Sequence, residues 1–208
     1  SESDTKALFN KCYATFGLTG NGNSGDVDGI DEGTSAFYRM MFELNEFPAD
    51  GGFWNWYNDV GVNEIYSLSW TANNTLISGL YYRFYFDITL CNHFLETYSG
   101  SNDAEIQQMC AEVRWIRACN YYYVLDMFLN VPFCDKVTSE SPKQISRAEL
   151  FSWLENELKE LEGALPATKA NPYRVDKNAA TFLLMRMYLN AEVYTGKAQW
   201  QNAADYAA

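Results

Sequence analysis

Five leucines spaced by three or four residues constrain the fold of this chain more than any other feature of its sequence. The spacing follows the α-helical turn of about 3.6 residues and puts all five side chains on one face. Ser146 and Glu149 precede the stripe as a capping box, and Pro166 ends it. The sequence therefore predicts a helix over 146–166 whose apolar face packs against other helices. The leucines are Leu150, Leu154, Leu158, Leu161 and Leu165.

The rest of the chain repeats this pattern of apolar stripes separated by polar or glycine-rich stops. Asn102 with Glu105 forms a second capping-box pattern, and Asp176 is placed to cap a helix that ends at Gly196. Alternation typical of a strand is weak and confined to 64–70. We therefore predict an all-α fold. Its other helices are expected over 4–16, 35–47, 76–98, from 102 to a point before Pro132, over 176–196, and from 200 onward.

The last two predicted helices have the spacing of a tetratricopeptide-type pair. In the first, Ala180, Leu184 and Tyr188 recur every four residues. In the second, the alanines within 203–207 offer small side chains for close packing. The glycine usual in the middle of such a repeat is absent. Because a stacked array leaves an apolar face at its end, we expect the natural protein to continue beyond Ala208.

Residues 48–75 show no helical periodicity but are rich in aromatic side chains. Trp54, Trp56 and Tyr57 follow two glycines, and Trp70 lies near the end of the stretch. Asn and Asp residues stand between them. Aromatic rings can stack on the C–H face of a sugar, while Asn and Asp side chains bind its hydroxyl groups. The stretch indicates either a sugar-binding loop or a loop whose rings fasten it to the core.

Composition excludes several classes of protein. With 48% hydrophobic residues among 208, the chain can form a large core and is not expected to be disordered. No uncharged apolar run reaches about 18 residues, so we expect no membrane-spanning helix. The formal charge of −12 disfavours nucleic acid and anionic lipid as partners. A neutral or cationic ligand is compatible with this charge, although acidity alone can simply maintain solubility.

Recognisable catalytic motifs are absent from the sequence. The single histidine, His93, lies on a predicted helix, and the carboxylates nearest the tryptophans are Asp50, Asp59 and Glu64. Paired carboxylates can hydrolyse glycosides, but a chain with 27 acidic residues brings such neighbours together by chance. We therefore expect no enzymatic activity and no cofactor.

Three further features leave alternatives open. Asp26, Asp28 and Asp31 could form a solvated acidic turn or hold calcium, although their spacing is not that of an EF-hand. The five cysteines lack metal-site spacing and are expected to be buried thiols. Asn73 and Asn74 match a glycosylation sequon, and either residue also suits a helix N-cap.

Four segments together resemble the SusD/RagB family of glycan-binding outer-membrane lipoproteins from Bacteroidetes. The first two are similar to the starch-binding branch, and the last two are general to the family. Because they are spread over nearly the whole chain, the resemblance does not depend on a single motif. The segments are DGIDEGTSAFYR at 28–39; FWNW at 53–56 with SW at 69–70; EVRWIRA at 112–118 with YYY at 121–123 and VPF at 131–133; and DKNAA at 176–180 with YLNA at 188–191 and YTG at 194–196.

The resemblance implies a fold of tetratricopeptide-type helix pairs, with residues 1–208 as the N-terminal helical domain of a longer protein and residues 48–75 as an irregular loop within it. It implies a non-enzymatic protein that captures oligosaccharides at the cell surface. A lipid would tether the full-length form to the outer membrane. The implied partners are an oligosaccharide, with a starch-like α-glucan expected, and a SusC-like TonB-dependent porin that receives it.

The same resemblance implies which residues bind the sugar. Trp54 stands at the position of a member of the aromatic arc that cups the glucan, and Trp56 is expected to support the loop. Arg39 matches a basic residue that binds glucose hydroxyls, and Asp31 matches an acidic position near the ligand. Asp59 replaces an amide that grips adjacent hydroxyls. Since an ionised aspartate accepts hydrogen bonds but donates none, that contact must differ here.

Two other functions remain compatible with the sequence. A tetratricopeptide-type scaffold that binds only protein would use the same helix pairs and keep the tryptophans as structural residues. A glycosidase fragment would need a carboxylate such as Asp59 or Glu64 to act on the sugar. The three functions differ in what they predict: sugar binding that depends on Trp54, protein association without a response to sugar, or release of reducing ends from starch.

Overall fold

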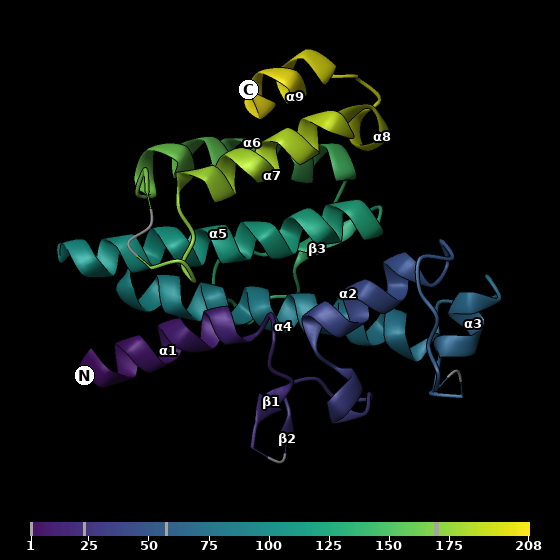
Figure 1. Cartoon of the computed structure of the whole chain (residues 1–208). Helices are drawn as coiled ribbons and strands as arrows, with labels where there is room; N and C mark the ends of the chain where they lie inside the picture. The colour runs from purple at the N-terminus through teal and green to yellow at the C-terminus, as the bar shows by residue number, and fades with distance from the viewer. Residues whose placement is uncertain (1, 23, 57, 169–170) are drawn as a thin grey trace. The chain divides into compact units, whose positions relative to one another are not determined.

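The computed structural model describes residues 2–22, 24–56, 58–168 and 171–208 (Figure 1). Most of these residues are helical, which confirms the predicted all-α fold. The chain divides into two compact units, one of residues 10–87 and the other of residues 1–9 with 88–208. The boundaries predicted for the helical domain, 1–208, and for the loop, 48–75, stay predictions.

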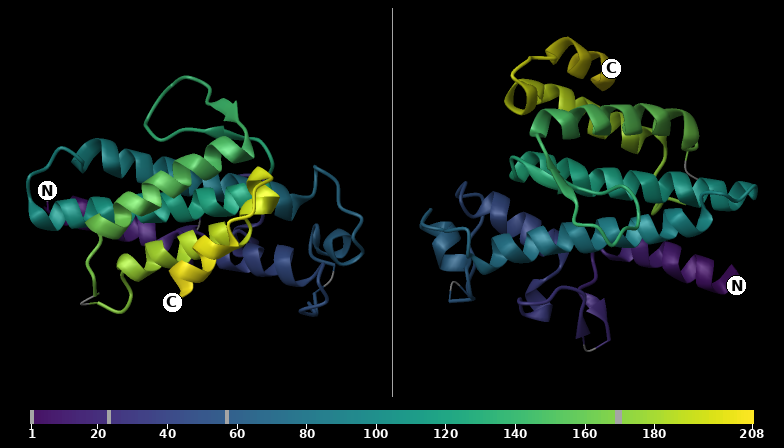
Figure 2. Two further views of the ribbon diagram at one scale, coloured as in Figure 1. Left: turned by 90° about the horizontal axis from the view of Figure 1, so that it is seen from above. Right: turned by 180° about the vertical axis from the view of Figure 1, so that it is seen from behind.

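The 88–208 unit is built from successive layers of helices. Helix α6 packs against both α5 and α7, and α7 packs against α9 (Figures 1 and 2). Two further helices, α1 (Glu2–Ala14) and α4 (Thr75–Tyr98), contribute residues to both units. The layered helices are α5 (Ala104–Met127), α6 (Arg147–Ala164), α7 (Lys177–Leu189), α8 (Ala191–Thr195) and α9 (Trp200–Ala207).

The leucine stripe forms the buried face of α6, as predicted. Its first four members are completely inaccessible to solvent, and Leu165 is nearly so. The predicted capping box is also present, because the Ser146 hydroxyl accepts from the backbone N–H of Glu149 at 3.2 Å and the Glu149 carboxylate accepts from the N–H of Ser146 at 2.8 Å. The stripe and its cap therefore determine both where α6 begins and which side it buries.

Helices α7 and α9 form the predicted pair, but their contact uses fewer alanines than expected. The α7 residues selected by the four-residue spacing are buried. In α9, only Ala203 is buried, whereas Ala204 and Ala207 are exposed. An alanine run shows that close packing is possible, but it does not show which side of a short helix makes the contact.

Two helix boundaries differ from those predicted. The N-cap of α5 is Asp103 and not Asn102, because the Asp103 carboxylate accepts from the backbone N–H groups of Glu105 and Ile106 at 2.9 and 3.1 Å. The helix predicted over 176–196 is interrupted at Asn190, which separates α7 from α8. Its predicted ends are correct, because Asp176 caps α7 and a left-handed Gly196 ends α8.

The strands of the described residues were not predicted from the sequence. They form two short antiparallel pairs, β1 (Gly20–Asn21) with β2 (Ser24–Gly25), and β3 (Val131–Phe133) with β4 (Lys143–Ile145). Strands this short carry no readable alternation. The weak alternation over 64–70, from which no strand was predicted, overlaps the end of α3 (Val62–Tyr66).

The 10–87 unit arranges its irregular segments around a small apolar core. Phe47, Val62, Ile65 and Leu76 are buried together, and Trp54 packs against them. The 48–75 stretch is therefore fastened to a core, as one of its two interpretations expects. The elements of this unit are β1, β2, η1 (Glu32–Thr34), α2 (Phe37–Glu46), α3 and the first half of α4.

Gly79 allows the acidic turn to approach α4 closely. A Cβ atom at this position would lie 2.5 Å from Cδ1 of Ile30 and 3.3 Å from the sulfur of Met40. A larger residue at position 79 would therefore require the end of the Ile30 side chain to shift.

Arg83 connects the glycine-rich segment to α4 from inside the protein. Its guanidinium donates to the carbonyl oxygens of Thr19 and Ser35 at 2.9 and 3.0 Å and to Oδ2 of Asp26 at 3.3 Å. Lys11 also pairs with Asp26, at 2.7 Å. Asp26 is therefore held by two cations. Among the described residues no three His, Cys, Asp or Glu side chains cluster as metal ligands, so the calcium interpretation gains no support.

Asn74 is the N-cap of α4, in agreement with one of the two interpretations of the Asn–Asn pair. Its Oδ1 accepts from the backbone N–H groups of Leu76 and Ile77 at 3.0 and 3.2 Å. Its Nδ2 donates to the carbonyl oxygen of Gly61 at 2.9 Å and to Oε2 of Glu64 at 2.5 Å. One side chain therefore caps α4 and holds the loop that leads into α3.

Replacing Asn74 by alanine should lower the free energy of unfolding by about 2 kcal/mol, because it removes a helix cap and leaves the partly buried carbonyl of Gly61 without its donor. Chemical denaturation measures this loss. Asn73→Ala is the matched control, since Asn73 is exposed whereas Asn74 is buried. Equal stability losses in the two variants would contradict the assignment of Asn74 as the cap.

The structure also shows how deeply the cysteines are buried and how apolar the helices are. Four cysteines are buried, as predicted, whereas Cys134 is only half-buried. Within the described part of the chain, no helix combines the length and apolar character required to cross a membrane.

Candidate functional site

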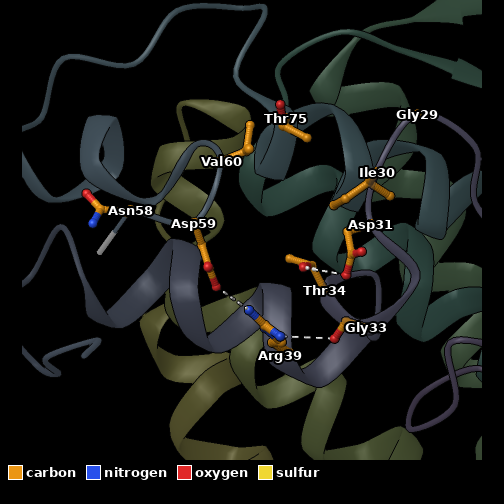
Figure 3. Close-up of a pocket in the computed structure, with 10 residues that line it drawn as sticks. All are labelled: Gly29, Ile30, Asp31, Gly33, Thr34, Arg39, Asn58, Asp59, Val60 and Thr75. Carbon is orange, nitrogen blue, oxygen red and sulfur yellow. Dashed lines mark hydrogen bonds and ion pairs between the residues drawn. The ribbon is translucent and has the colours of Figure 1, made fainter. Parts of the chain in front are cut away.

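A cavity of about 850 Å³ opens between two segments of the 10–87 unit (Figure 3). One wall is the turn at residues 29–34, and the other is the segment at residues 58–60. Arg39 and Thr75 complete the lining. Three of the five predicted site residues, Asp31, Arg39 and Asp59, thus line one cavity or hold its walls in place.

Arg39 joins the two walls from the first turn of α2. Its Nη1 donates to the carbonyl oxygen of Gly33 at 3.0 Å, and its Nη2 donates to Oδ2 of Asp59 at 3.2 Å (Figure 3). Its Nε donates to Oε1 of Glu43 at 2.8 Å. Each nitrogen of the guanidinium therefore donates one hydrogen bond within the protein. The remaining N–H groups of Nη1 and Nη2 can donate to a ligand.

Trp54 and Asp59 extend this network into the aromatic stretch. The indole Nε1 of Trp54 donates to Oδ2 of Asp59 at 3.3 Å, and the guanidinium of Arg39 lies 4.9 Å from the centre of the indole ring. The backbone N–H of Trp54 donates to the hydroxyl of Tyr66, which donates to the carbonyl oxygen of Gly52 at 3.0 Å. Trp54 is half-buried and held in one orientation.

Trp56 exposes more of its ring than Trp54 does. Its ring stands at 81° to that of Trp54 with 5.4 Å between centres, and 62% of the residue is accessible. Trp70 is 44% exposed. Neither Trp54 nor Trp56 lines the cavity, and Tyr57 lies outside the described residues. The division of roles between Trp54 and Trp56 stays a prediction.

Asp31 faces the cavity from the turn before η1. Its Oδ1 accepts from the Thr34 hydroxyl at 3.4 Å, and its backbone carbonyl accepts from the N–H of Thr34 at 3.0 Å (Figure 3). These bonds use little of the carboxylate's capacity, so Asp31 can accept from ligand hydroxyls.

Glu43 is the main site residue that sequence reasoning missed. Its side chain is 1% exposed, and its Oε1 is the acceptor for Nε of Arg39. Burial raises the pKa of this carboxyl group, and the hydrogen bond and charge of Arg39 oppose the shift. The available signal was the four-residue spacing of Arg39 and Glu43, which puts both on one side of α2.

Two of the three carboxylates considered for catalysis, Asp59 and Glu64, are hydrogen-bond acceptors. Asp59 accepts from Arg39 and Trp54, and Glu64 accepts from the Asn74 amide. Both carboxylates are therefore held in place by side-chain donors of their own unit.

Comparison with known proteins gives three consistent matches. Residues 33–189 match a family described as "Starch-binding associating with outer membrane". The starch-binding protein SusD of Bacteroides thetaiotaomicron is 38% identical over 208 residues, covering 98% of this chain and 38% of that protein. A SusD-like carbohydrate-binding protein from Bacteroides fragilis matches in structure with 24% identity and a TM-score of 0.71, covering 99% of this chain and 39% of that one.

A crystal structure with xylogluco-oligosaccharide matches with 19% identity and a TM-score of 0.74, covering 99% of this chain and 39% of that one. At this identity the match concerns the fold. Together the comparisons define a class of helical proteins named for the carbohydrates they bind. This chain belongs to the SusD-like family.

The relatives are named for binding and not for a reaction, which agrees with the expectation of a non-catalytic protein. The chain spans about two fifths of the length of the curated relative. The resemblance seen in the sequence is thus confirmed at the level of the family.

Proposed function

We propose that this chain supplies part of a carbohydrate-binding site, with a neutral oligosaccharide of the starch-like α-glucan type as ligand. The observation that carries the proposal is the network of Arg39, Asp59 and Trp54, which fixes hydrogen-bonding groups beside an aromatic ring. Sugar recognition requires this combination of an apolar face with donors and acceptors at its edge. The 38% identity to a starch-binding protein supports the α-glucan in particular.

The proposal extends to location and delivery. The family description includes association with the outer membrane, which supports placing the protein at the bacterial surface. There it would hand the oligosaccharide to a SusC-like TonB-dependent porin, with a lipid tether in the full-length form. A protein-binding scaffold without sugar affinity is the alternative, and no specific observation favours it.

The test of the proposed function is a titration of maltoheptaose into the full chain, followed by calorimetry and tryptophan fluorescence. We expect saturable binding. Trp54→Ala should weaken it at least about tenfold, since about 1.4 kcal/mol of ring contact and held polar geometry is lost. Trp70→Ala is the control, because Trp70 is exposed in the same stretch and lies outside the network.

Unchanged affinity in Trp54→Ala would contradict the site. Because Trp54 also packs on the core of its unit, circular dichroism must show that the variant is folded. Asp59→Ala gives a second measurement, since Asp59 is partly exposed and belongs to the same network. Loss of binding in both variants, with retained folding, would support the proposed function.

A further inference from the structure

Glu43 is a buried carboxylate that pairs with Arg39 in addition to the carboxylate of Asp59. Its carboxylate is buried on the same side of α2 as Arg39, with Oε1 2.8 Å from Nε. Its Oε2 is also buried and has no hydrogen-bond partner among the described residues. Among the described contacts, Arg39 is therefore the only cationic side chain that pairs with Glu43.

The charges around the cavity sum to a negative value. Arg39 is the only cationic side chain among the described lining residues. Three carboxylates act on it or share its cavity: Glu43 and Asp59 pair with it at 2.8 and 3.2 Å, and Asp31 lines the cavity. One positive charge thus faces three negative ones, in a chain whose overall charge is −12.

We propose that Glu43 is a positioning residue that fixes Arg39 and cancels its charge, so that the site accepts neutral oligosaccharides and rejects glycans that carry carboxylate or sulfate groups. This inference rests on the proposed function and adds the substrate class of the same site. Glu43 does not line the cavity, so it acts through Arg39.

The occupied edge of the guanidinium explains the rejection of anions. An arginine binds an anion most strongly through two parallel N–H groups. In Arg39 the edge formed by Nε and Nη2 already faces the carboxylates of Glu43 and Asp59. A ligand anion would meet only the remaining N–H groups, and would be repelled by the carboxylates around them.

A neutral hydroxyl meets the same groups favourably. It can accept from a remaining N–H of Arg39 and donate to the carboxylate of Asp59 or Asp31. The aspartate at position 59, which cannot donate, suits ligands whose hydroxyls donate. Charge cancellation by Glu43 thus turns a cationic side chain into a fixed array of donors for neutral sugar.

The experiment compares maltoheptaose with the same oligosaccharide oxidised at C6 to glucuronate units, both titrated into the full chain by calorimetry. We expect the unmodified chain to bind maltoheptaose at least about tenfold more tightly than the oxidised form. Glu43→Gln keeps the size of the side chain and an acceptor for Nε of Arg39 but removes the charge. It should lose most of the discrimination, measured as the ratio of the affinities for the two ligands.

The control variant is Glu46→Gln, which removes one charge from the same helix outside the cavity lining. It should discriminate as the unmodified chain does. Discrimination by Glu43→Gln equal to that of the unmodified chain would overturn the inference, and so would equal binding of both ligands by the unmodified chain. Absence of binding to either ligand would instead contradict the proposed function.

A measurement on the unmodified chain covers the case in which Glu43→Gln does not fold. If carboxylates repel the oxidised ligand, added salt must strengthen its binding while the affinity for maltoheptaose changes little. Weaker binding of the oxidised ligand at high salt would show net attraction to the anion and would overturn the inference.

Discussion

Replacing Arg83 by methionine should destabilise the 10–87 unit by about 3–5 kcal/mol, the cost of removing one member of a buried ion pair. Arg83 is completely buried and donates to the carbonyl oxygens of Thr19 and Ser35 and to the carboxylate of Asp26. Methionine fills similar space but donates nothing. Both carbonyls and the carboxylate would lose a donor, and the carbonyl of Ser35 would lose it at a buried position.

The same substitution should abolish ligand binding, because Arg83 holds the segment that carries the site. Thr19 and Ser35 lie on either side of the turn that contains Asp31 and Gly33. Gly33 in turn accepts from Arg39. Release of this segment therefore separates the two walls of the cavity, so stability and binding should fall together.

Denaturant unfolding gives the stability loss, and hydrogen exchange read by mass spectrometry shows where it occurs. Arg186→Met is the control, since the Arg186 guanidinium lies over the rings of Tyr122 and Phe182 in the other unit. We expect that control to cost about 1 kcal/mol. Arg83→Met with the stability of the control, or with faster exchange only outside 10–87, would contradict the assigned role.

The helices could be predicted because each rests on a local signal. The stripe of α6 and its Ser146 cap lie within about five turns of chain, and the structure reproduces both. The error at the start of α5 shows the limit. Asn102 and Asp103 are both good caps, and only the geometry of the first turn selects Asp103. Adjacent residues of similar chemistry cannot be separated by pattern alone.

The site could be predicted only in part because its contacts join distant residues. The resemblance selected Arg39 and Asp59, which are 20 positions apart and form an ion pair. It did not indicate Glu43 as a partner of Arg39, or show that Trp56 is more exposed than Trp54. The burial and orientation of the tryptophan rings depend on how residues 48–75 fold onto their core. That stretch has no periodicity from which its packing could be predicted.

Asp87 is a second buried acid, and it lies in a crowded cluster of charges. Neither of its carboxylate oxygens is exposed, and neither accepts a hydrogen bond of normal geometry from the described residues. The nearest cation is Arg83, 3.9 Å away, which also pairs with Asp26. Lys11 pairs with Asp26 as well, and the Thr15 hydroxyl donates to a backbone carbonyl.

Burial raises the pKa of Asp87 well above its usual range. The charges of Arg83 and Lys11 and the nearby Thr15 hydroxyl oppose this shift, whereas the charge of Asp26 adds to it. The folded protein therefore retains a proton that the unfolded chain releases. Above the unfolded pKa, each further pH unit up to the folded pKa costs about 1.4 kcal/mol of stability. Asp87 thus lowers stability as the pH rises from acidic to neutral.

Asp87→Asn should therefore stabilise the protein at neutral pH relative to acidic pH, because asparagine resembles the protonated acid and has no proton to release. The gain should shrink as the pH falls and vanish below the usual pKa of aspartate. Denaturant unfolding of both proteins from acidic to neutral pH measures this difference. The difference also cancels the contributions of other carboxyls, such as Glu43, whose pKa is likewise raised by burial.

Asp205→Asn is the matched control, because it makes the same chemical change at an exposed position on α9. A gain from Asp87→Asn that is the same at every pH would show that packing and not the bound proton produces it. A loss at neutral pH would show that the contact with Arg83 outweighs the cost of burial, and that Asp87 is ionised in the folded protein.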